Sequence, residues 1–312
     1  MGKKLRIGTR ESQLAVWQAT TVQGMLAEKG IESELVLIKS EGDIDLKTPL
    51  YAMGVQGVFT RSLDIALLNG KIDIAVHSMK DVPTQLPAGI IQSAVLKRGP
   101  VKDLLVFKGN WHMSDGQWVK KDGSPMHIAT SSVRRTSQWL NRYPSTSIHN
   151  LRGNVNTRLR KLAEENWDGA IFAAAGLERI GLRPENSIEL DWMLPAPAQG
   201  AIMVVCGTDD QYAFDACQLL NDELTAQCTK VERDFLRTLM GGCSTPISAH
   251  ATITGNTMHF QGEILSLDGA QKAAIDQQIT LEQVENWGKV AAELILAQGG
   301  QAIVDAINHA GN

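Results

Sequence analysis

A short apolar strand followed by a helical pattern occurs in two matching copies within the first two thirds of this chain. The first copy has its strand at 5–9 and its helical pattern at 14–26. The second has its strand at 126–130 and its helical pattern at 133–141. In both copies the strand ends on Thr, and Ser and Arg open the helix. Strands that alternate with helices are typical of α/β proteins with largely parallel sheets, so we predict two related α/β domains.

The match between the two copies extends beyond the first helix. Second strands are predicted at 33–38 and 146–151, and third strands at 72–76 and 167–172. Ligands of such sheets bind beyond the carboxyl ends of the strands, where helix N-termini present free N–H groups to anions. We therefore expect the two domains to face one another across a cleft that binds an anionic ligand.

The last third of the chain follows a different pattern. Residues 194–200 predict a connection, and the apolar strand predicted at 201–206 returns to the first domain. A long helix is predicted at 222–240, where two glycines end it. The rest of this third domain is predicted as strands of alternating polarity and one final helix, at 248–254, 257–267, 273–279 and 281–298.

Charge and composition argue against several classes of protein. The chain has 312 residues, enough for two or three domains, and a net charge of −4, whereas dedicated nucleic-acid binders carry a clear positive excess. The first ten residues are basic, but no long apolar stretch follows them. No segment approaches the roughly 18 apolar residues that span a bilayer. We therefore expect a cytoplasmic protein that binds neither nucleic acid nor membranes.

The four cysteines do not follow a metal or disulfide pattern. They include no C-x-x-C pair and no histidine at zinc-ligand spacing, so we expect free thiols and no bound metal. Cys243 differs from the others because Gly241 and Gly242 leave its sulfur uncrowded and Pro246 fixes the exit from the turn. A cysteine beside a turn is commonly a small buried side chain, whereas this setting favours an attachment point for a covalently carried group.

Cations and hydroxyl groups gather at the predicted strand ends, together with one acid, Asp81. Arginine binds carboxylates through a planar fork, so repeated arginines indicate a ligand that bears several carboxylates. Arg158 and its neighbours also fit a solvated helix face with ion pairs to Glu164 and Glu165. The residues at these strand ends are Arg10, Ser12, Lys80, Asp81, Thr130, Ser131, Ser132, Arg134, Arg135, Arg152, Arg158 and Arg179.

Two interpretations from other classes fit part of this pattern. A periplasmic-type binding module would explain the twin domains and the anion cleft, but it needs neither Cys243 nor a third domain. A cysteine hydrolase would explain an uncrowded thiol. The sequence, however, places no histidine as its base, and His250 and His259 lie in predicted strands.

Five segments of the chain resemble those of the porphobilinogen deaminase family, also called hydroxymethylbilane synthases. They read IGTRES, AVHSMKDVP, TSSVRR, LRGNVNTR and GGC, at 7–12, 75–83, 130–135, 151–158 and 241–243. The segments occur in the family's order and are spread over nearly the whole chain. Each segment is weak evidence for the resemblance by itself, and the five together are highly specific for the family.

The resemblance implies a monomeric transferase of porphyrin and haem (tetrapyrrole) biosynthesis. Such an enzyme joins four porphobilinogen molecules head to tail with loss of ammonia, and then releases linear hydroxymethylbilane by hydrolysis. It also implies two α/β domains like those of periplasmic binding proteins, and a smaller C-terminal α/β (α+β) domain that carries a cofactor cysteine. We predict domain 1 at 1–98 and 200–220, domain 2 at 103–194 and domain 3 at 222–312.

The resemblance also implies roles for single residues. Cys243 would hold one dipyrromethane cofactor through a thioether, and Asp81 would be catalytic. A carboxylate there would stabilise the positive charge that develops on pyrrole nitrogens and could move protons. The other expected cofactor-binding residues are Asp43, Ser78, Lys80, Thr130, Ser132, Arg134 and Arg135. The expected substrate-binding residues are Arg10, Ser12, Gln18, Arg152, Arg158 and Arg179.

The chain departs from the family's pattern at several places, among them Gln56 and the pair Pro197-Ala198. Gln56 stands where members of the family commonly carry a lysine, which puts a lid cation in doubt, although Phe59 remains to cover the cofactor. Pro197 and Ala198 stand where Val-Gly is more typical. Neither change touches Asp81 or the arginines.

Overall fold

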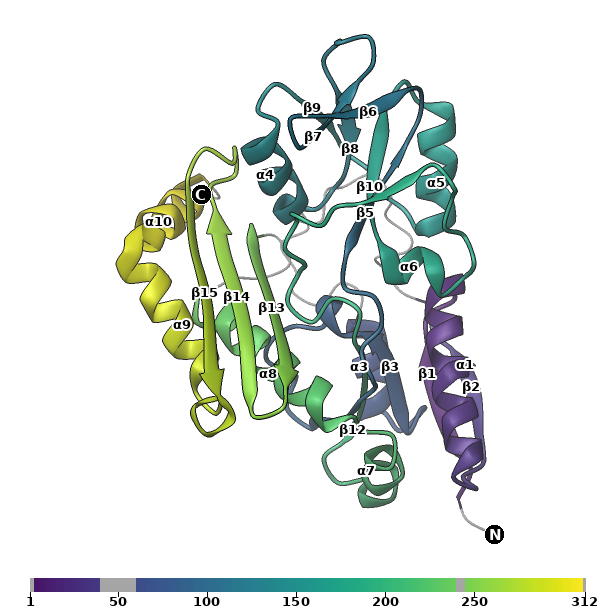
Figure 1. Cartoon of the computed structure of the whole chain (residues 1–312). Helices are drawn as coiled ribbons and strands as arrows, with labels where there is room; N and C mark the ends of the chain where they lie inside the picture. The colour runs from purple at the N-terminus through teal and green to yellow at the C-terminus, as the bar shows by residue number, and fades with distance from the viewer. Residues whose placement is uncertain (1–2, 40–59, 240–244, 311–312) are drawn as a thin grey trace.

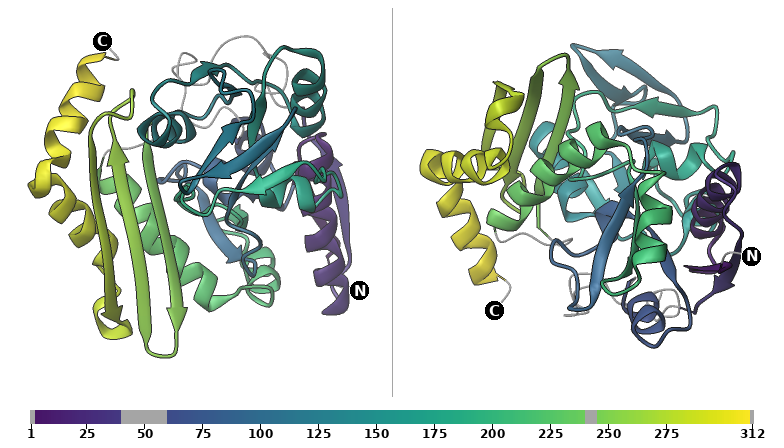
Figure 2. Two further views of the ribbon diagram at one scale, coloured as in Figure 1. Left: turned by 45° about the horizontal axis from the view of Figure 1, so that its top comes forward. Right: turned by 90° about the horizontal axis from the view of Figure 1, so that it is seen from below.

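The computed structural model describes residues 3–39, 60–239 and 245–310. In Figure 1 two units with central sheets lie one above the other, and a third unit with an antiparallel sheet lies beside them. Figure 2 shows from two further directions that this third sheet stays on one side of the molecule. The predicted fold class, two α/β domains and a smaller C-terminal α/β (α+β) domain, is confirmed.

The N-terminal unit is built on a mixed sheet. Its described strands, in spatial order, are β2 (Ser33–Leu37), β1 (Leu5–Thr9), β3 (Ile74–Ser78), β12 (Ile202–Gly207) and β4 (Ile90–Val95). β1 is parallel to β2 and β3, whereas β12 is antiparallel to β3 and β4. α1 (Gln13–Glu28) and α7 (Gln211–Gln218) pack on one face, and α3 (Arg61–Leu68) packs on the other. The central strands β3 and β12 are largely buried because helices cover both faces of the sheet.

The second unit repeats this arrangement. Its described strands, in spatial order, are β9 (Ser147–His149), β8 (His127–Ala129), β10 (Gly169–Ala173), β5 (Asp103–Phe107) and β11 (Ser187–Glu189). β8 is parallel to β9 and β10, and β5 is antiparallel to β10 and β11. Each unit therefore has parallel strands followed by an antiparallel pair, so the predicted match between the two copies extends to topology. The unit's helices and its surface hairpin are α4 (Val133–Arg142), α5 (Val155–Glu164), α6 (Ala174–Glu178), β6 (Trp111–Ser114) and β7 (Gln117–Lys120).

The third unit packs helices on one antiparallel sheet. α8 (Glu223–Thr238) begins where the side chain of Asp222 accepts a hydrogen bond from the amide of Thr225. The meander consists of β13 (Ile247–Thr254), β14 (Thr257–Leu265) and β15 (Lys272–Thr280). Phe235 of α8 and Phe260 of β14 meet edge to face in a fully buried core. The long helix and the three strands of this unit were predicted close to their observed bounds.

The prediction of a single final helix at 281–298 was wrong. A 3₁₀ turn, η3 (Leu281–Gln283), comes first, and α9 spans Trp287–Ile295. The turn η4 (Leu296–Gly300) then leads to α10 (Gln301–Ala310), which the sequence analysis missed. Gly299 has a φ of 101°, outside the helical region, so the helical path kinks at the glycine pair and resumes in α10.

One helical stretch of the described residues, Trp287–His309, has the length and apolar composition of a membrane span, with a mean hydropathy of 1.3. The sequence analysis expected no such stretch. It contains α9 and α10, which are 9 and 10 residues long and are separated by the non-helical Gln298 and Gly299. At a rise of 1.5 Å per residue each helix is about 15 Å long, about half of the hydrocarbon core of a bilayer. Neither helix spans a membrane by itself.

Two connections, 96–102 and 190–201, join the first two units. They approach closely at Gly200, where φ is 85° and a Cβ atom would lie 2.7 Å from the carbonyl oxygen of Pro100. Ala198 has a φ of 61°, in the left-handed region that favours glycine. The family's Val-Gly at this place therefore suits the backbone better than the Pro197-Ala198 of this chain. β12 follows these connections and pairs with β3 and β4 of the first unit, which confirms the predicted return of this strand to the first domain, while the exact domain bounds stay predictions.

Candidate active site

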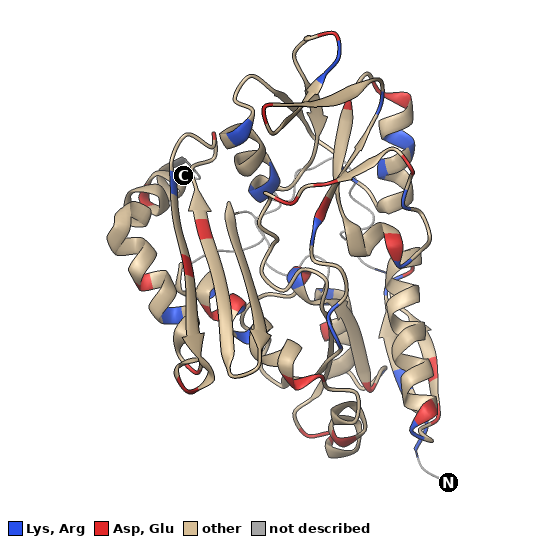
Figure 3. Ribbon diagram, in the orientation of Figure 1, with Lys and Arg blue, Asp and Glu red and all other residues tan. Residues whose placement is uncertain are grey.

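A cavity of about 740 Å³ lies where the three units meet. Its walls include the carboxyl ends of β3 and β10, the starts of α1, α4 and α5, and Leu236 and Ile247 of the third unit. Figure 3 marks Lys and Arg positions in blue on the ribbon, and several of these blue segments lie around the junction of the upper and lower units. The cavity therefore occupies the place that the sequence pattern predicted for an anion site. The predicted site residues that line it are Arg10, Ser12, Gln18, Ser78, Lys80, Asp81, Ser132, Arg134, Arg135, Arg152 and Arg158.

Helix N-termini open into this cavity from both α/β units. Ser12 caps α1 by accepting a hydrogen bond from the amide of Ala15, and Ser132 caps α4 in the same way. Asn154 caps α5 by accepting from the amide of Thr157 at 3.0 Å. Serine and asparagine at these positions start the helices locally. The positive ends of the three helix dipoles consequently face one cavity, which favours a bound anion.

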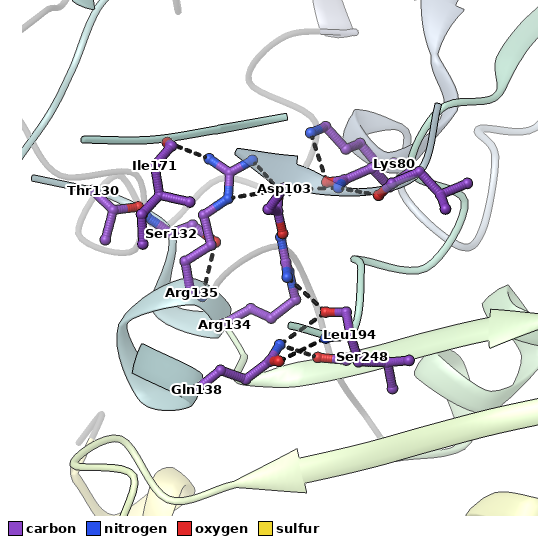
Figure 4. Close-up of polar contacts among 12 residues, drawn as sticks. Lys80, Asp103, Thr130, Ser132, Arg134, Arg135, Gln138, Ile171, Leu194 and Ser248 are labelled. Atoms are coloured by element: carbon purple, nitrogen blue, oxygen red, sulfur yellow. Dashed lines mark hydrogen bonds and ion pairs between the residues drawn. The ribbon is translucent and has the colours of Figure 1, made fainter. Parts of the chain in front are cut away.

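Asp103 is the buried acid at the centre of the arginine pair (Figure 4). Arg134 Nη2 donates to Asp103 Oδ2 at 2.7 Å, and Arg135 Nη2 donates to Asp103 Oδ1 at 2.8 Å. Gln199 Nε2 adds a third donor at 3.0 Å. Burial alone would raise the pKa of Asp103, but the charges of Arg134 and Arg135 outweigh it and hold the pKa at about 2. Asp103 is thus an ionised internal partner that orients both arginines.

The described lining of the cavity carries more cations than acids. It includes seven Lys and Arg side chains but only two acids, Glu11 and Asp81. Burial, followed by the charge of Arg135, lowers the pKa of Lys80 to about 8 and that of Arg158 to about 10. Such shifts mean that burial disfavours the charged forms of both side chains. A ligand with several carboxylates would stabilise those charged forms.

Arg134 has one more side-chain donor than the described residues satisfy. Its side chain is 5% exposed and uses Nη1 and Nη2 for the carbonyl of Leu194 and the carboxylate of Asp103. Its buried Nε has no hydrogen-bond partner in the described part of the chain. A buried N–H without an acceptor is costly, so this atom indicates a place for an anionic oxygen.

Asp81 stands in the turn that leaves the central strand of the first unit. η2 (Met79–Asp81) follows β3 directly, so the side chains of the turn reach the carboxyl edge of the sheet. Lys80 Nζ donates to Gln199 Oε1 at 3.2 Å, and Gln18 Nε2 donates to Ser78 Oγ at 2.9 Å. These contacts hold Ser78 and Lys80, which precede Asp81 in the sequence.

His77 is the histidine of the cavity. It is buried, and burial followed by the charge of Arg10 lowers its pKa to about 4. Its imidazole is therefore neutral near pH 7, and it adds no positive charge to the site.

Two predicted site residues do not belong to the described cavity lining. Arg179 Nη2 donates to the carbonyl of Gly200 at 2.6 Å, and its guanidinium lies 5.6 Å from the ring centre of Trp17. Thr130 accepts a hydrogen bond from the amide of Ser132 at 3.2 Å. The structure thus places Arg179 at the connection between the units and Thr130 beneath the start of α4. Asp43, Gln56, Phe59 and Cys243 lie outside the described residues.

The other three cysteines are buried in the cores of the described units. Burial raises the pKa of all three thiols, that of Cys217 to about 12 and that of Cys228 to about 11. Thiols in such settings are poor nucleophiles. Within the described ranges, no group of three or more His, Cys, Asp or Glu residues is placed to hold a metal ion.

The sequence analysis missed several residues that build the site. Asp103 and Gln199 interact with the predicted arginines and lysine from positions far along the chain. The one local signal for Asp103 was an acid at the start of an apolar strand. Buried strands seldom begin with an unpaired charge, so a cationic partner was to be expected.

The chain is similar to known proteins over almost its full length. The porphobilinogen deaminase of Pelobacter propionicus is 38% identical over 98% of this chain and 97% of its own length. The porphobilinogen deaminase of Trichlorobacter lovleyi is 39% identical over the same shares. Among solved structures, a Salmonella typhimurium periplasmic binding protein with high arginine specificity has a TM-score of 0.42 and 11% identity, over 72% of this chain and 94% of that one.

Two family models match the chain in succession. The model described as porphobilinogen deaminase, dipyromethane cofactor binding domain, matches residues 5–215. The model described as porphobilinogen deaminase, C-terminal domain, matches residues 226–297. Together with the relatives and with the cationic cavity, these matches lead to one conclusion: the chain belongs to the porphobilinogen deaminase family.

Proposed function

We propose that this chain is a hydroxymethylbilane synthase, which joins four porphobilinogen molecules head to tail, loses one ammonia at each step and releases the linear product by hydrolysis. The observation that carries the proposal is the cavity at the junction of the three units, whose described lining includes seven Lys and Arg side chains and two acids. Porphobilinogen bears an acetate and a propionate, so each added unit brings two carboxylates. We further propose that the enzyme acts as a cytoplasmic monomer.

The residues of the cavity fit a polycarboxylated pyrrole chain. The Nε of Arg134, which has no hydrogen-bond partner in the described part of the chain, and the buried ammonium of Lys80 are both suited to bind carboxylate oxygens. Partly exposed apolar side chains of the lining, such as Leu14, Val155 and Leu236, offer surfaces for the rings. We propose that Lys80, Ser132, Arg134 and Arg135 hold a dipyrromethane attached to Cys243. Arg10, Ser12, Gln18, Arg152 and Arg158 would bind the substrate carboxylates.

Asp81 has the chemical role in this proposal. When bound, the dipyrromethane supplies the free pyrrole carbon to which the first substrate is joined. Ammonia leaves the aminomethyl group of porphobilinogen, a carbon–carbon bond forms and a ring proton is lost. Positive charge develops on pyrrole nitrogens during these changes. The Asp81 carboxylate, which lines the cavity, would accept their N–H hydrogen bonds, stabilise the charge and take up the proton.

A turnover assay tests this function. The purified protein is incubated with porphobilinogen, and substrate, ammonia and hydroxymethylbilane are measured. We expect one ammonia for each porphobilinogen consumed and one product for every four. Binding of porphobilinogen without release of ammonia would contradict the proposal and favour a binding module.

The two groups of arginines are expected to differ in their effects. Arg134→Gln should lower the fraction of protein that carries the cofactor, because a buried donor to its carboxylates is lost. Arg10→Gln should keep the cofactor and raise KM about tenfold or more, the effect of one lost charge-assisted hydrogen bond. Intact mass and steady-state kinetics distinguish the two results. Full cofactor and an unchanged KM in both variants would show that the assignment to the cavity is wrong.

Cofactor uptake is expected to depend on the protonation of Lys80. Burial lowers the pKa of this amine to about 8, so the free site loses one positive charge as pH rises through 8. Cofactor-free protein should therefore take up its cofactor more slowly at pH 9 than at pH 7. Lys80→Arg should flatten this decline, because a guanidinium stays charged throughout the range. Intact mass followed over time measures uptake, and equal rates at both pH values in the parent would refute the prediction.

A further inference from the structure

Arg233 holds the backbone on both sides of Asp81. It lies on α8 and is only 9% exposed. Its Nη1 donates to the carbonyl oxygens of Met79 at 3.3 Å and Val82 at 2.9 Å. Its Nη2 donates to the carbonyl oxygen of Pro83 at 2.6 Å. One planar guanidinium from the third unit thus fixes three points of the loop that carries the proposed catalytic acid.

The amide side of the same loop is held from within the first unit. The amide of Met79 donates to the carbonyl of Ala201 at 3.0 Å, and that of Val82 donates back to Met79 at 3.1 Å. The carbonyl oxygens of Met79, Val82 and Pro83 accept their side-chain hydrogen bonds from Arg233. Arginine suits this task because its five donors form a rigid fork, which an ammonium group cannot reproduce.

The neighbouring residue on α8 holds the connections between the units. Glu232 is fully buried and accepts two hydrogen bonds from Arg98, at 2.6 and 2.9 Å. It also accepts from the amides of Ala198 at 2.6 Å and Ala251 at 2.7 Å. One turn of α8 therefore contacts both connections, 96–102 and 190–201, and β13 of the third sheet. The helix ends at Thr238, five positions before Cys243 in the sequence.

We propose that Arg233 is a positioning residue that fixes the carboxylate of Asp81 relative to the third unit. The proposal rests on the function proposed above. Arg233 is not among the described residues that line the 740 Å³ cavity. It lines a second cavity of about 590 Å³, so it acts through the loop and not on the ligand. Misplacement of a catalytic group on the order of 1 Å can cost about a hundredfold in rate.

Arg233→Met tests this role because methionine keeps the apolar stem and removes all donors. We expect kcat to fall about tenfold to a hundredfold while KM changes by less than about twofold. Intact mass should show that the variant carries its cofactor. Arg233→Lys should recover part of the rate, because an ammonium can reach some of the three carbonyls.

A matched control separates positioning from loss of stability. Thr229 is fully buried on the same helix, and its hydroxyl donates to the carbonyl of Thr225 at 2.7 Å. Thr229→Val removes this hydrogen bond without touching the loop, so it should lower the Tm and leave kcat unchanged. A second readout is the double variant with Asp81→Glu. If Arg233 acts through Asp81, the loss from Arg233→Met should be smaller in that background than in the parent.

The outcomes separate this inference from the proposed function. A parent protein without cofactor mass and without turnover contradicts the function. If the parent is active and its Arg233→Met variant keeps kcat within about twofold, the positioning role is overturned. It is also overturned if the double variant loses as much activity as the product of the two single losses, because the two residues then act independently. If Arg233→Met does not fold, the kinetics of Arg233→Lys test the positioning role instead. A loss in kcat of about fivefold or more at unchanged KM supports the role, and a smaller loss overturns it.

Discussion

Asp81→Asn is expected to lower the turnover of porphobilinogen by about a hundredfold to a thousandfold while the protein stays folded and keeps its cofactor. The amide preserves the size of the side chain and one acceptor, but it removes the negative charge that would stabilise cationic pyrrole nitrogens. Loss of one preorganised electrostatic contact of this kind costs roughly 3 to 4 kcal/mol in the transition state. Steady-state kinetics measure the rate, and intact mass shows the cofactor and any bound substrate units.

Asp81→Glu is the matched control that separates the effect of the carboxylate's charge from the effect of its position. Glutamate keeps the charge and moves it by one methylene, so only a small residual activity is expected. The structural alternative is that Asp81 merely ends the turn η2, where Asn would serve as well. Turnover of Asp81→Asn within a few-fold of the parent would support that alternative and remove Asp81 from the mechanism.

Cys243→Ser is expected to give a folded protein that has neither the covalent cofactor nor activity. A serine hydroxyl at the same position is a far weaker nucleophile than a thiolate, so the attachment should not form. Intact mass should equal that of the bare chain, and ammonia release should be at background. A Cys243→Ser protein that still carries pyrrole mass would show that the attachment site lies elsewhere.

Cys228→Ala is the control for this variant. The thiol of Cys228 is buried on α8, and burial raises its pKa to about 11, so it should take no part in attachment. Alanine fits the apolar surroundings, and the variant should keep its cofactor and turnover within a few-fold of the parent. Loss of the cofactor in Cys228→Ala with an unchanged Tm would argue against Cys243 as the sole attachment point.

The local signals of the sequence were sufficient for the twin architecture. Apolar runs that end on Thr, followed by Ser12 or Ser132 as helix caps, predicted β1 with α1 and β8 with α4. The antiparallel strands β4, β5 and β11 were not predicted, because their pairing depends on distant partners. α10 was missed for a different reason. The glycine pair at 299–300 is typical of a helix end, but here Ile303 continues into the core of the third unit.

The candidate site was predicted only in part, for a similar reason. The local sequence pattern identifies residues at strand ends and helix caps, and most of them line the cavity. It does not identify the ion pairs that orient these residues. Asp103 is 31 residues from Arg134, and Glu232 is 134 residues from Arg98. Such contacts arise from the packing of the units, which no local pattern encodes. Arg179 illustrates the converse, because a cation near a strand end contacts the connection at Gly200.

The most direct test of the proposed function is the intact mass of the purified chain before and after incubation with porphobilinogen. The proposal predicts a protein heavier than the bare chain by one covalently bound dipyrromethane. After addition of substrate, it predicts further species spaced by one pyrrole unit, and these should be absent from Cys243→Ser. A protein with the mass of the bare chain in both samples, although folded and supplied with substrate, would contradict the proposal.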